Sequence, residues 1–249
     1  MRQVWVVADR FAGFAEEEGV YTTSGFARLA AGWAADGEPV TVWLGQGIGD
    51  YERGYLDGVV TRLGIGWLVR FEGGPGEPAG REVVHKHAES NVLLSDVRAA
   101  GDHEYIAGLR LAADNELLLD HQTGCHVQGM VVVEAIRQMF LAAFETGYRH
   151  RFPDRDYYTV WNGLDLEFRS FLFPLPALLR CVIESAALAD PRRLDFTARV
   201  EITQAGQDVA AANSRFTAFD AARIGPAERR RARYAVESLT AAPAVNGAS

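Results

Sequence analysis

A short segment of the chain combines residues that can transfer protons with a strongly apolar run. It reads LLLDHQTGCHVQGMVVVEAIRQ from Leu117 to Gln138, with His121 and His126 ahead of the apolar run that contains Glu134. A buried carboxylate costs free energy unless it is paired, hydrogen-bonded or used in chemistry. Because desolvation raises the proton affinity of a carboxyl group, Glu134 could serve as a general base or acid. Either histidine could be the second proton carrier.

Two residues that follow Glu134 leave a structural alternative open. Arg137 comes three positions later and could form an ion pair with the carboxylate, or bind a phosphate group of a substrate or carrier. Gln138 comes four positions later, on the same helical face, and could orient the carboxylate. The segment is therefore consistent with a catalytic Glu134 and with a purely structural ion pair.

Three further motifs favour ordinary structure over chemistry. Cys125 has no neighbour except His126 that could activate it as a nucleophile. His85 and His87 have the two-residue spacing of one strand face, but a third ligand is not evident, so no metal site is expected. Residues 45–49, GQGIG, could cradle a phosphate. They lack the dinucleotide-binding fingerprint, and a plain strand-to-helix turn is the preferred interpretation.

The first 72 residues alternate between two kinds of apolar pattern. Phe26, Leu29, Ala30 and Trp33 follow helical spacing, and Gly37 supplies a stop signal. The expected strands are 4–8, 40–45 and 66–71, and the expected helices are 23–37 and 49–64. This order predicts a small parallel α/β module over residues 1–72, followed by a Gly- and Pro-rich linker over 73–82.

The pattern changes to period two after the linker. Residues 164–169 and 194–203 alternate apolar and polar side chains, which is typical of antiparallel strands with one buried face. Further strands are expected at 91–97, 104–112, 177–185 and 211–219. One long helix, apolar on nearly all sides, is expected from about 127 to 147. The prediction is an α+β chain, in which residues 83–222 form a hotdog fold, an antiparallel sheet wrapped around a central helix.

The motif at residues 120–138 carries a resemblance to a known family. DHQTGCHVQGMVVVEAIRQ resembles the A-factor biosynthesis hotdog family, with its Asp-His, a short turn, His-Val-Pro-Gly-Met and Glu-Ala-x-Arg-Gln. It is more distantly similar to the 3-hydroxyacyl-ACP dehydratases. The chain departs from the family motif at Gln128, where proline is usual, and in a turn before His126 that is one residue longer.

The resemblance implies which residues form the site. The expected catalytic residues are Glu134, His121 and His126, and the expected substrate-binding residues are Asp120, Gly129, Met130, Arg137 and Gln138. In hotdog thioester enzymes the N–H groups at the helix N-terminus face the acyl thioester. Gly129 suits that place because it leaves room for the ligand.

The resemblance also implies a function and an assembly. It indicates an enzyme of bacterial specialised metabolism that acts on an acyl thioester of an acyl carrier protein or of CoA. The reaction would be acyl transfer to a hydroxyl acceptor or dehydration of a 3-hydroxyacyl thioester. The alternatives are a thioesterase and a non-catalytic hotdog protein that binds an acyl chain or small ligand. Because a single hotdog leaves a sheet edge exposed, we expect a homodimer with shared sites.

Composition limits the remaining possibilities. The net charge of −8 argues against binding to nucleic acid or to an anionic membrane. Two cysteines suggest no disulfide framework, and we find no secretory signal or membrane-spanning run, so a soluble cytoplasmic protein without a cofactor is expected. Residues 223–249 are expected to form a C-terminal helix and a disordered tail, with the basic run 229–233 on an exposed helical face.

Overall fold

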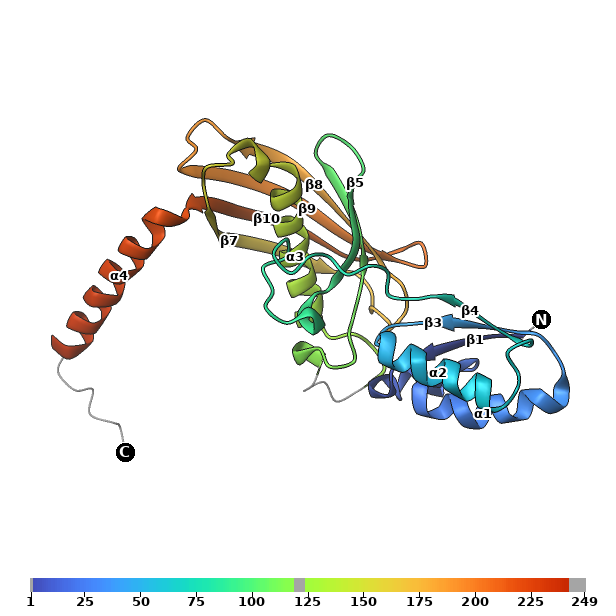
Figure 1. Ribbon diagram of the computed structural model, residues 1–249. Coiled ribbons are helices and arrows are strands. Elements are labelled where there is room, and N and C mark those ends of the chain that lie inside the picture. Colours follow the sequence, from blue (N-terminus) through green and yellow to red (C-terminus); the bar gives the residue numbers. More distant parts are fainter. Residues whose placement is uncertain (1, 119–123, 242–249) are drawn as a thin grey trace.

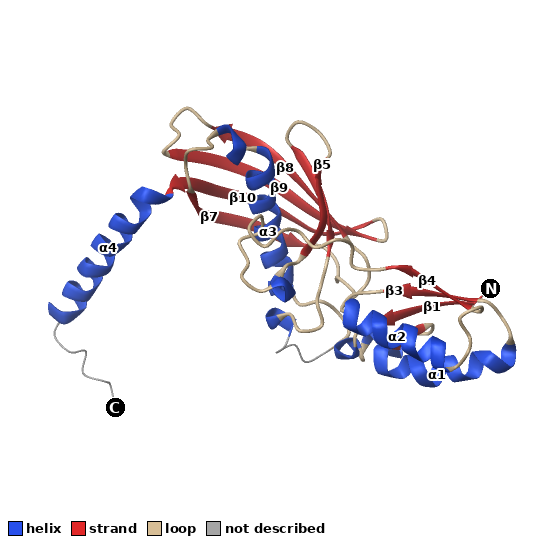
Figure 2. Cartoon of the chain, viewed as in Figure 1, coloured by secondary structure: helices blue, strands red, loops and turns tan. Residues whose placement is uncertain are grey.

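The computed structural model describes residues 2–118 and 124–241, which form two sheets and four α-helices within that part of the chain (Figures 1 and 2). The N-terminal elements are β1 (Arg2–Val7), β2 (Val20–Thr22), α1 (Thr23–Asp36), β3 (Val40–Leu44), α2 (Asp50–Arg62) and β4 (Val69–Gly73). They are followed by β5 (Leu94–Ala99), β6 (Glu104–Leu109), α3 (Gly129–Gly147), β7 (Tyr157–Phe168), β8 (Leu178–Ala187), β9 (Arg193–Gln204), β10 (Gln207–Asp220) and α4 (Ala221–Ala241). Short 3-10 turns lie at Asp9–Phe11, Phe14–Glu16, Glu89–Asn91, Glu116–Leu118 and Arg149–Arg151.

The N-terminal module is a parallel sheet in the order β2-β1-β3-β4, with α1 and α2 on one side of it (Figure 2). The Thr22 hydroxyl accepts a hydrogen bond from the Gly25 N–H and caps α1, and Gly37 ends this helix in the left-handed conformation. The expected alternation of strands and helices is confirmed. Sequence analysis missed β2, because three residues are too few to establish a periodic pattern.

The second sheet is antiparallel throughout, in the order β5-β6-β8-β9-β10-β7, and α3 lies across one of its faces (Figure 1). The predicted hotdog fold and the α+β class are therefore confirmed. The expected domain boundaries after residues 72, 82 and 222 stay predictions. Among the described residues, no helix combines the length and apolar character needed to cross a membrane.

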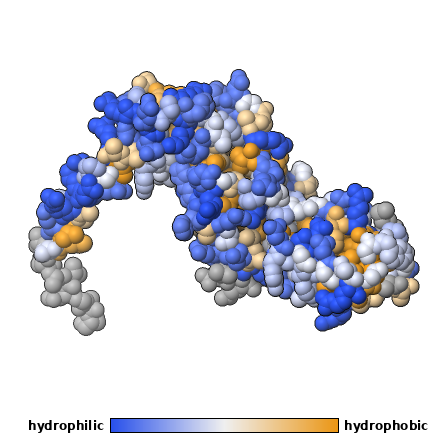
Figure 3. All heavy atoms as spheres, in the orientation of Figure 1, coloured by the Kyte–Doolittle hydropathy of each residue, from blue (hydrophilic) through white to orange (hydrophobic). Residues whose placement is uncertain are grey.

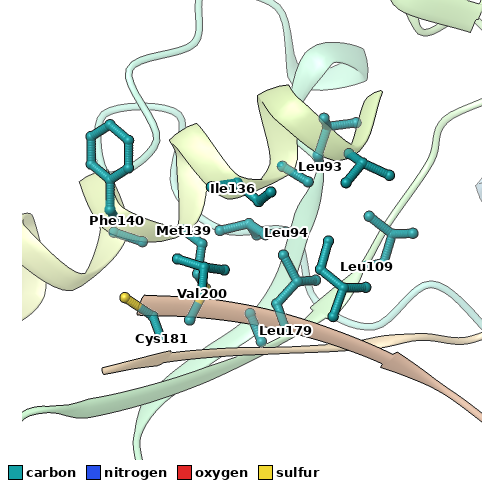
Figure 4. Packing of buried hydrophobic residues seen from close by; sticks show 14 of the residues in the cluster. Leu93, Leu94, Leu109, Ile136, Met139, Phe140, Leu179, Cys181 and Val200 are labelled. Carbon is teal, nitrogen blue, oxygen red and sulfur yellow. The ribbon is translucent and has the colours of Figure 1, made fainter. Parts of the chain in front are cut away.

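The core of the hotdog forms where α3 meets the sheet. Figure 4 shows Ile136 and Met139 of α3 near side chains of the sheet. The ring of Phe140 stacks on that of Phe216 of β10, with centroids 4.5 Å apart, and all three α3 residues are buried. Strand β9 buries every second residue, as its alternation predicts. Strand β7 departs from its prediction, because Leu164 and Phe168 remain exposed. They pair in register with buried residues of β10, so they face the α3 side of the sheet at an end that no further layer covers.

The glycine-rich loop between β3 and α2 fastens the module to the hotdog sheet. Gln46 is buried; its Nε2 donates to the carbonyl of Leu109 at 3.0 Å, and its Oε1 accepts from the N–H of Leu111 at 2.8 Å. Gly47 has φ +79°, and a Cβ there would lie 2.4 Å from the Cβ of Ala8. Residues 45–49 form a turn between β3 and α2, in which Gly47 permits close packing against Ala8.

The two edges of the antiparallel sheet differ in whether another segment covers them. The linker runs along β5, where the Ala79 N–H donates to the Leu94 carbonyl and the Asp96 N–H to the Glu77 carbonyl, each at 2.9 Å. At the other edge, β7 pairs only with β10 among the described residues. One edge is thus covered by the chain itself, and the other presents unpaired backbone groups.

Replacement of Gln46 should weaken the joint between the two sheets. Gln46→Ala leaves the buried N–H of Leu111 without its side-chain acceptor, so we expect the free energy of unfolding to fall by about 2–3 kcal/mol. Urea titration followed by tryptophan fluorescence measures this change. The matched control is Gln3→Ala on β1, an exposed glutamine whose loss should cost less than about 0.5 kcal/mol. Equal effects of the two changes would contradict the role of Gln46.

Candidate active site

The backbone before α3 enters the helix in an extended conformation. Gln128, at the position where the related motif has proline, has φ −68° and ψ 152°, which is the conformation that proline favours. The Val127 N–H donates to the carbonyl of Leu172 at 2.7 Å and fixes this entry. The Gln128 side chain makes no capping hydrogen bond. The N–H groups of the first helical turn, which carry partial positive charge, are therefore not capped by this residue.

A cavity of about 560 Å³ lies beside this helix end. Phe168 at the end of β7 and Phe171 just after it lie on its wall, and they are 53% and 65% exposed. The ring centroid of His126 lies 5.0 Å from that of Phe171. A Cβ at Gly129 would lie 3.1 Å from Cζ of Phe168, so glycine preserves the space here. The other lining residues are Val127, Val132, Arg169, Ser170, Leu172 and Val209.

Three side chains hold the carboxylate of Glu134. Arg137 donates from Nε to Oε2 at 2.9 Å and from Nη2 to Oε1 at 3.2 Å. Gln138 donates from Nε2 to Oε1 at 3.1 Å, and Nζ of Lys86 lies 2.6 Å from the same oxygen. The Glu134 side chain is only 17% exposed. The cost of burying the charge is therefore offset by two cations and an amide.

Gln138 connects this carboxylate to the chain that enters β5. It is fully buried, and its Oε1 accepts from the N–H of Leu93 at 2.8 Å. Its Nε2 also donates to the carbonyl of Asn91 at 2.8 Å. Both ends of the amide are thus fixed by backbone groups. The remaining N–H of Gln138 is aimed at Glu134, so the amide orients the carboxylate.

The pKa of Glu134 follows from these opposing effects. Burial raises it, but the hydrogen bonds from Arg137, Lys86 and Gln138 together with the charge of Arg137 lower it, and the net pKa lies below the ordinary value. Glu134 is therefore ionised at neutral pH. In this state it can accept a proton or hold a cation, and it has no proton to donate.

The expected site residues fall into two groups within the chain. His126 and Gly129 line the cavity, whereas Glu134, Arg137 and Gln138 form the ion-pair cluster. Glu134 follows Gly129 by five positions, which turns its side chain by about 140° around the helix axis. Met130 in the first turn is exposed. Asp120 and His121 lie outside the described residues.

Sequence analysis did not identify Lys86 as part of the cluster. It lies in the HKH motif, whose two histidines were considered as possible metal ligands. The segment is a turn, not the strand that the motif suggested, and His85 has φ +54°. His85 contacts Glu145 of α3 at 2.9 Å, while Lys86 contacts Glu134. Only the packing of this turn against α3 shows that Lys86 is the residue of this motif that pairs with Glu134.

Metal and thiol chemistry find little support in the described parts of the chain. Across residues 2–118 and 124–241, no three His, Cys, Asp or Glu side chains gather as they would around a metal ion. Cys125 and Cys181 are free thiols. Burial raises the pKa of Cys181 to about 12, so this thiol is not a nucleophile at neutral pH.

Removal of the Lys86 cation should change how stability depends on pH. With its lowered pKa, Glu134 stabilises the fold above the ordinary value of 4.5, and this contribution is lost as pH falls through the depressed pKa. Lys86→Met should therefore cost about 1 kcal/mol at pH 7, and the cost should shrink towards pH 3. Urea titrations at the two pH values measure it. In a Glu134→Gln background the pH dependence of the Lys86→Met effect should vanish; if it persists, another group is responsible.

Comparison with solved structures finds hotdog proteins of low sequence identity. A putative thioesterase from Shewanella oneidensis has 8% identity and a TM-score of 0.40, covering 49% of this chain and 82% of its own. The dehydratase heterocomplex ApeI:P from Xenorhabdus doucetiae has 15% identity and a TM-score of 0.41, with coverages of 54% and 86%. A Streptococcus mutans protein bound to acetyl CoA has 15% identity and a TM-score of 0.37, with coverages of 50% and 88%.

A comparison with curated proteins gives no match. A comparison with protein families matches the A-factor biosynthesis hotdog domain over residues 71–220, which is more than half of the chain. The match contains the antiparallel sheet from β5 to β10, the helix α3 and the motif at residues 120–138. The resemblance found in the motif is confirmed, and the chain belongs to the A-factor biosynthesis hotdog family.

Proposed function

We propose that this protein is an enzyme that processes an acyl thioester carried by an acyl carrier protein or CoA. The observation that carries the proposal is the helix N-terminus, which Gln128 does not cap, beside a cavity with an aromatic wall and a histidine. The N–H groups of the first turn, which Gln128 does not cap, suit a thioester carbonyl, because they stabilise negative charge that develops on its oxygen. The aromatic wall formed with Phe168 and Phe171 suits the acyl chain.

Two reactions fit this arrangement. In acyl transfer, a hydroxyl acceptor attacks the thioester carbonyl and gives its proton to His126. The C–S bond then breaks, and the thiolate takes that proton to leave as a thiol. In dehydration, a base removes the α-proton of a 3-hydroxyacyl thioester, and the 3-hydroxyl leaves as water with a proton from an acid. Because Glu134 is ionised, it supplies the base, and a histidine supplies the acid.

The complete site in this proposal is formed by two copies of the chain. Within one protomer, His126 lies just before α3 and lines the cavity, whereas Glu134 of α3 is held in the ion-pair cluster. Near the cavity, the uncovered edge strand β7 and three exposed apolar side chains form a surface suited to a second copy; these are Met130, Phe168 and Phe171. A homodimer joined there would bring the His126 of one protomer towards the Glu134 of its partner.

A second candidate is a hotdog protein that binds an acyl group without turning it over. The saturated surroundings of Glu134 favour it, because three side chains already occupy both carboxylate oxygens. A thioesterase, in which water replaces the hydroxyl acceptor, uses the same cavity. The reaction products distinguish these possibilities.

Intact-mass spectrometry of acyl, 3-hydroxyacyl and 3-ketoacyl thioesters tests the function. We expect loss of one water, or loss of the acyl group only when a hydroxyl acceptor is present, and a rate about 10²- to 10⁴-fold lower in Glu134→Gln. His121→Ala and His126→Ala identify the working histidine. Glu145→Gln is the control, because it neutralises another partly buried carboxylate of α3 that contacts His85. Unchanged turnover in Glu134→Gln removes this residue from the mechanism, and no product with any substrate favours the binding protein.

Mixing of two inactive variants tests whether the site is shared. His126→Ala and Glu134→Gln protomers should form mixed dimers in which one site has both residues intact, giving about a quarter of wild-type activity. The control mixes His126→Ala with the double variant and should recover nothing. If native mass spectrometry shows mixed dimers but activity does not return, each site lies within one protomer.

A further inference from the structure

The C-terminal helix α4 extends away from the rest of the chain (Figure 1). Its base is attached where the Ala221 N–H donates to the Asp156 carbonyl at 2.8 Å, next to the start of β7. From residue 228 to residue 240 every residue is exposed. An isolated helix as short as this exposed segment is only marginally stable in water. Most helices in proteins are stabilised by packing of one face. The exposed part of α4 therefore lacks the contact that would stabilise it.

The exposed part of α4 carries an apolar stripe. Ala232, Ala235, Val236 and Leu239 stand at positions i, i+3, i+4 and i+7, which places them on one helical face. Val236 is 64% and Leu239 79% exposed. Figure 3 shows hydrophobic side chains in the outer part of this helix, amid hydrophilic ones. The pattern is that of a helix with one face against a protein surface.

The charge of α4 is opposite to that of the rest of the chain. The helix contains five arginines and two glutamates, a net charge of +3. Subtracting this from the chain total of −8 leaves −11 for all other residues. Two copies of the main body would repel each other, and a basic helix laid on the body of a second copy offsets that repulsion.

The position of α4 indicates which surface it meets. It leaves the body beside β7, the edge strand that pairs only with β10 among the described residues. A helix of 21 residues is about 30 Å long, enough to cross much of a protein of this size. A second copy that approaches the β7 edge would lie within reach of this helix.

We propose that α4 is an exchanged arm, whose apolar stripe packs on the body of a second copy. The proposal rests on the proposed homodimer and adds the segment that holds it together. Each arm would bury its stripe on the partner and place Arg229 and Arg231, which flank the stripe, close to an acidic body. The dimer would then depend on α4 as well as on the β7 edge.

Sedimentation velocity of the full chain tests this dependence. Val236→Asp with Leu239→Asp places two charges in the stripe and should raise the dimer dissociation constant at least about tenfold. Tyr234→Asp with Ser238→Asp adds the same charge on another exposed face of α4 and should change it less than about threefold. Near-UV circular dichroism should show an unchanged body in both variants, because α4 contacts it only at its base.

The outcomes separate the arm from the dimer and from the enzyme activity. If the two double variants weaken the dimer equally or not at all, the proposal that α4 is an exchanged arm is wrong, while the proposed homodimer is unaffected. A wild-type chain that is monomeric overturns both. Turnover in the thioester assay is measured independently, so its absence bears on the proposed function alone.

Cross-linking identifies the surface that α4 meets. A photoreactive residue at position 239 in an equal mixture of ¹⁴N- and ¹⁵N-labelled chains should give cross-linked peptide pairs that combine both isotopes. If all pairs are of a single isotope, α4 lies on its own body and the proposal is overturned. Cross-links only to an added acyl carrier protein would assign the helix to the carrier and overturn it as well.

Discussion

The fold depends on one constraint, the burial of α3 on nearly all of its sides. The second half of this helix carries an almost unbroken apolar sequence, which only a curled sheet can enclose (Figure 4). The strands β8 and β9 supply the enclosing face through alternating buried residues, and β10 adds residues that are buried over most of its length. The first turn of α3 extends beyond this enclosure. The same helix is therefore both the centre of the core and the wall of the candidate site.

The polar residues of α3 are placed where that burial begins. Gln138 is fully enclosed and satisfies backbone groups of the segment that enters β5. Glu134, one turn earlier, is held by Gln138, Arg137 and Lys86. A carboxylate in this position stays ionised in spite of its burial, because its partners contribute more than desolvation removes. The geometry gives the base of the proposed chemistry a fixed orientation and a fixed charge.

Three uncovered surfaces of the hotdog part of the chain lie on the β7 side. The linker covers the β5 edge, whereas the β7 edge, the aromatic side chains beside the cavity and the helix α4 have no covering layer among the described residues. A monomer that exposes all three is incomplete by the ordinary rules for sheet edges and apolar surface. This asymmetry is the physical basis for placing both the shared site and the exchanged arm on the β7 side.

The sequence by itself determined the hotdog class, the family motif, and most strands and helices, because apolar periodicity and capping residues act over a few neighbouring positions. It also brought Glu134, Arg137 and Gln138 onto one helix. Only the tertiary structure decided that Lys86 completes this cluster, that Gln46 joins the two sheets, and that Leu164 stays exposed. The first two features join residues far apart in the chain, and the third depends on which surface another layer covers. A pattern of neighbouring residues contains neither kind of information.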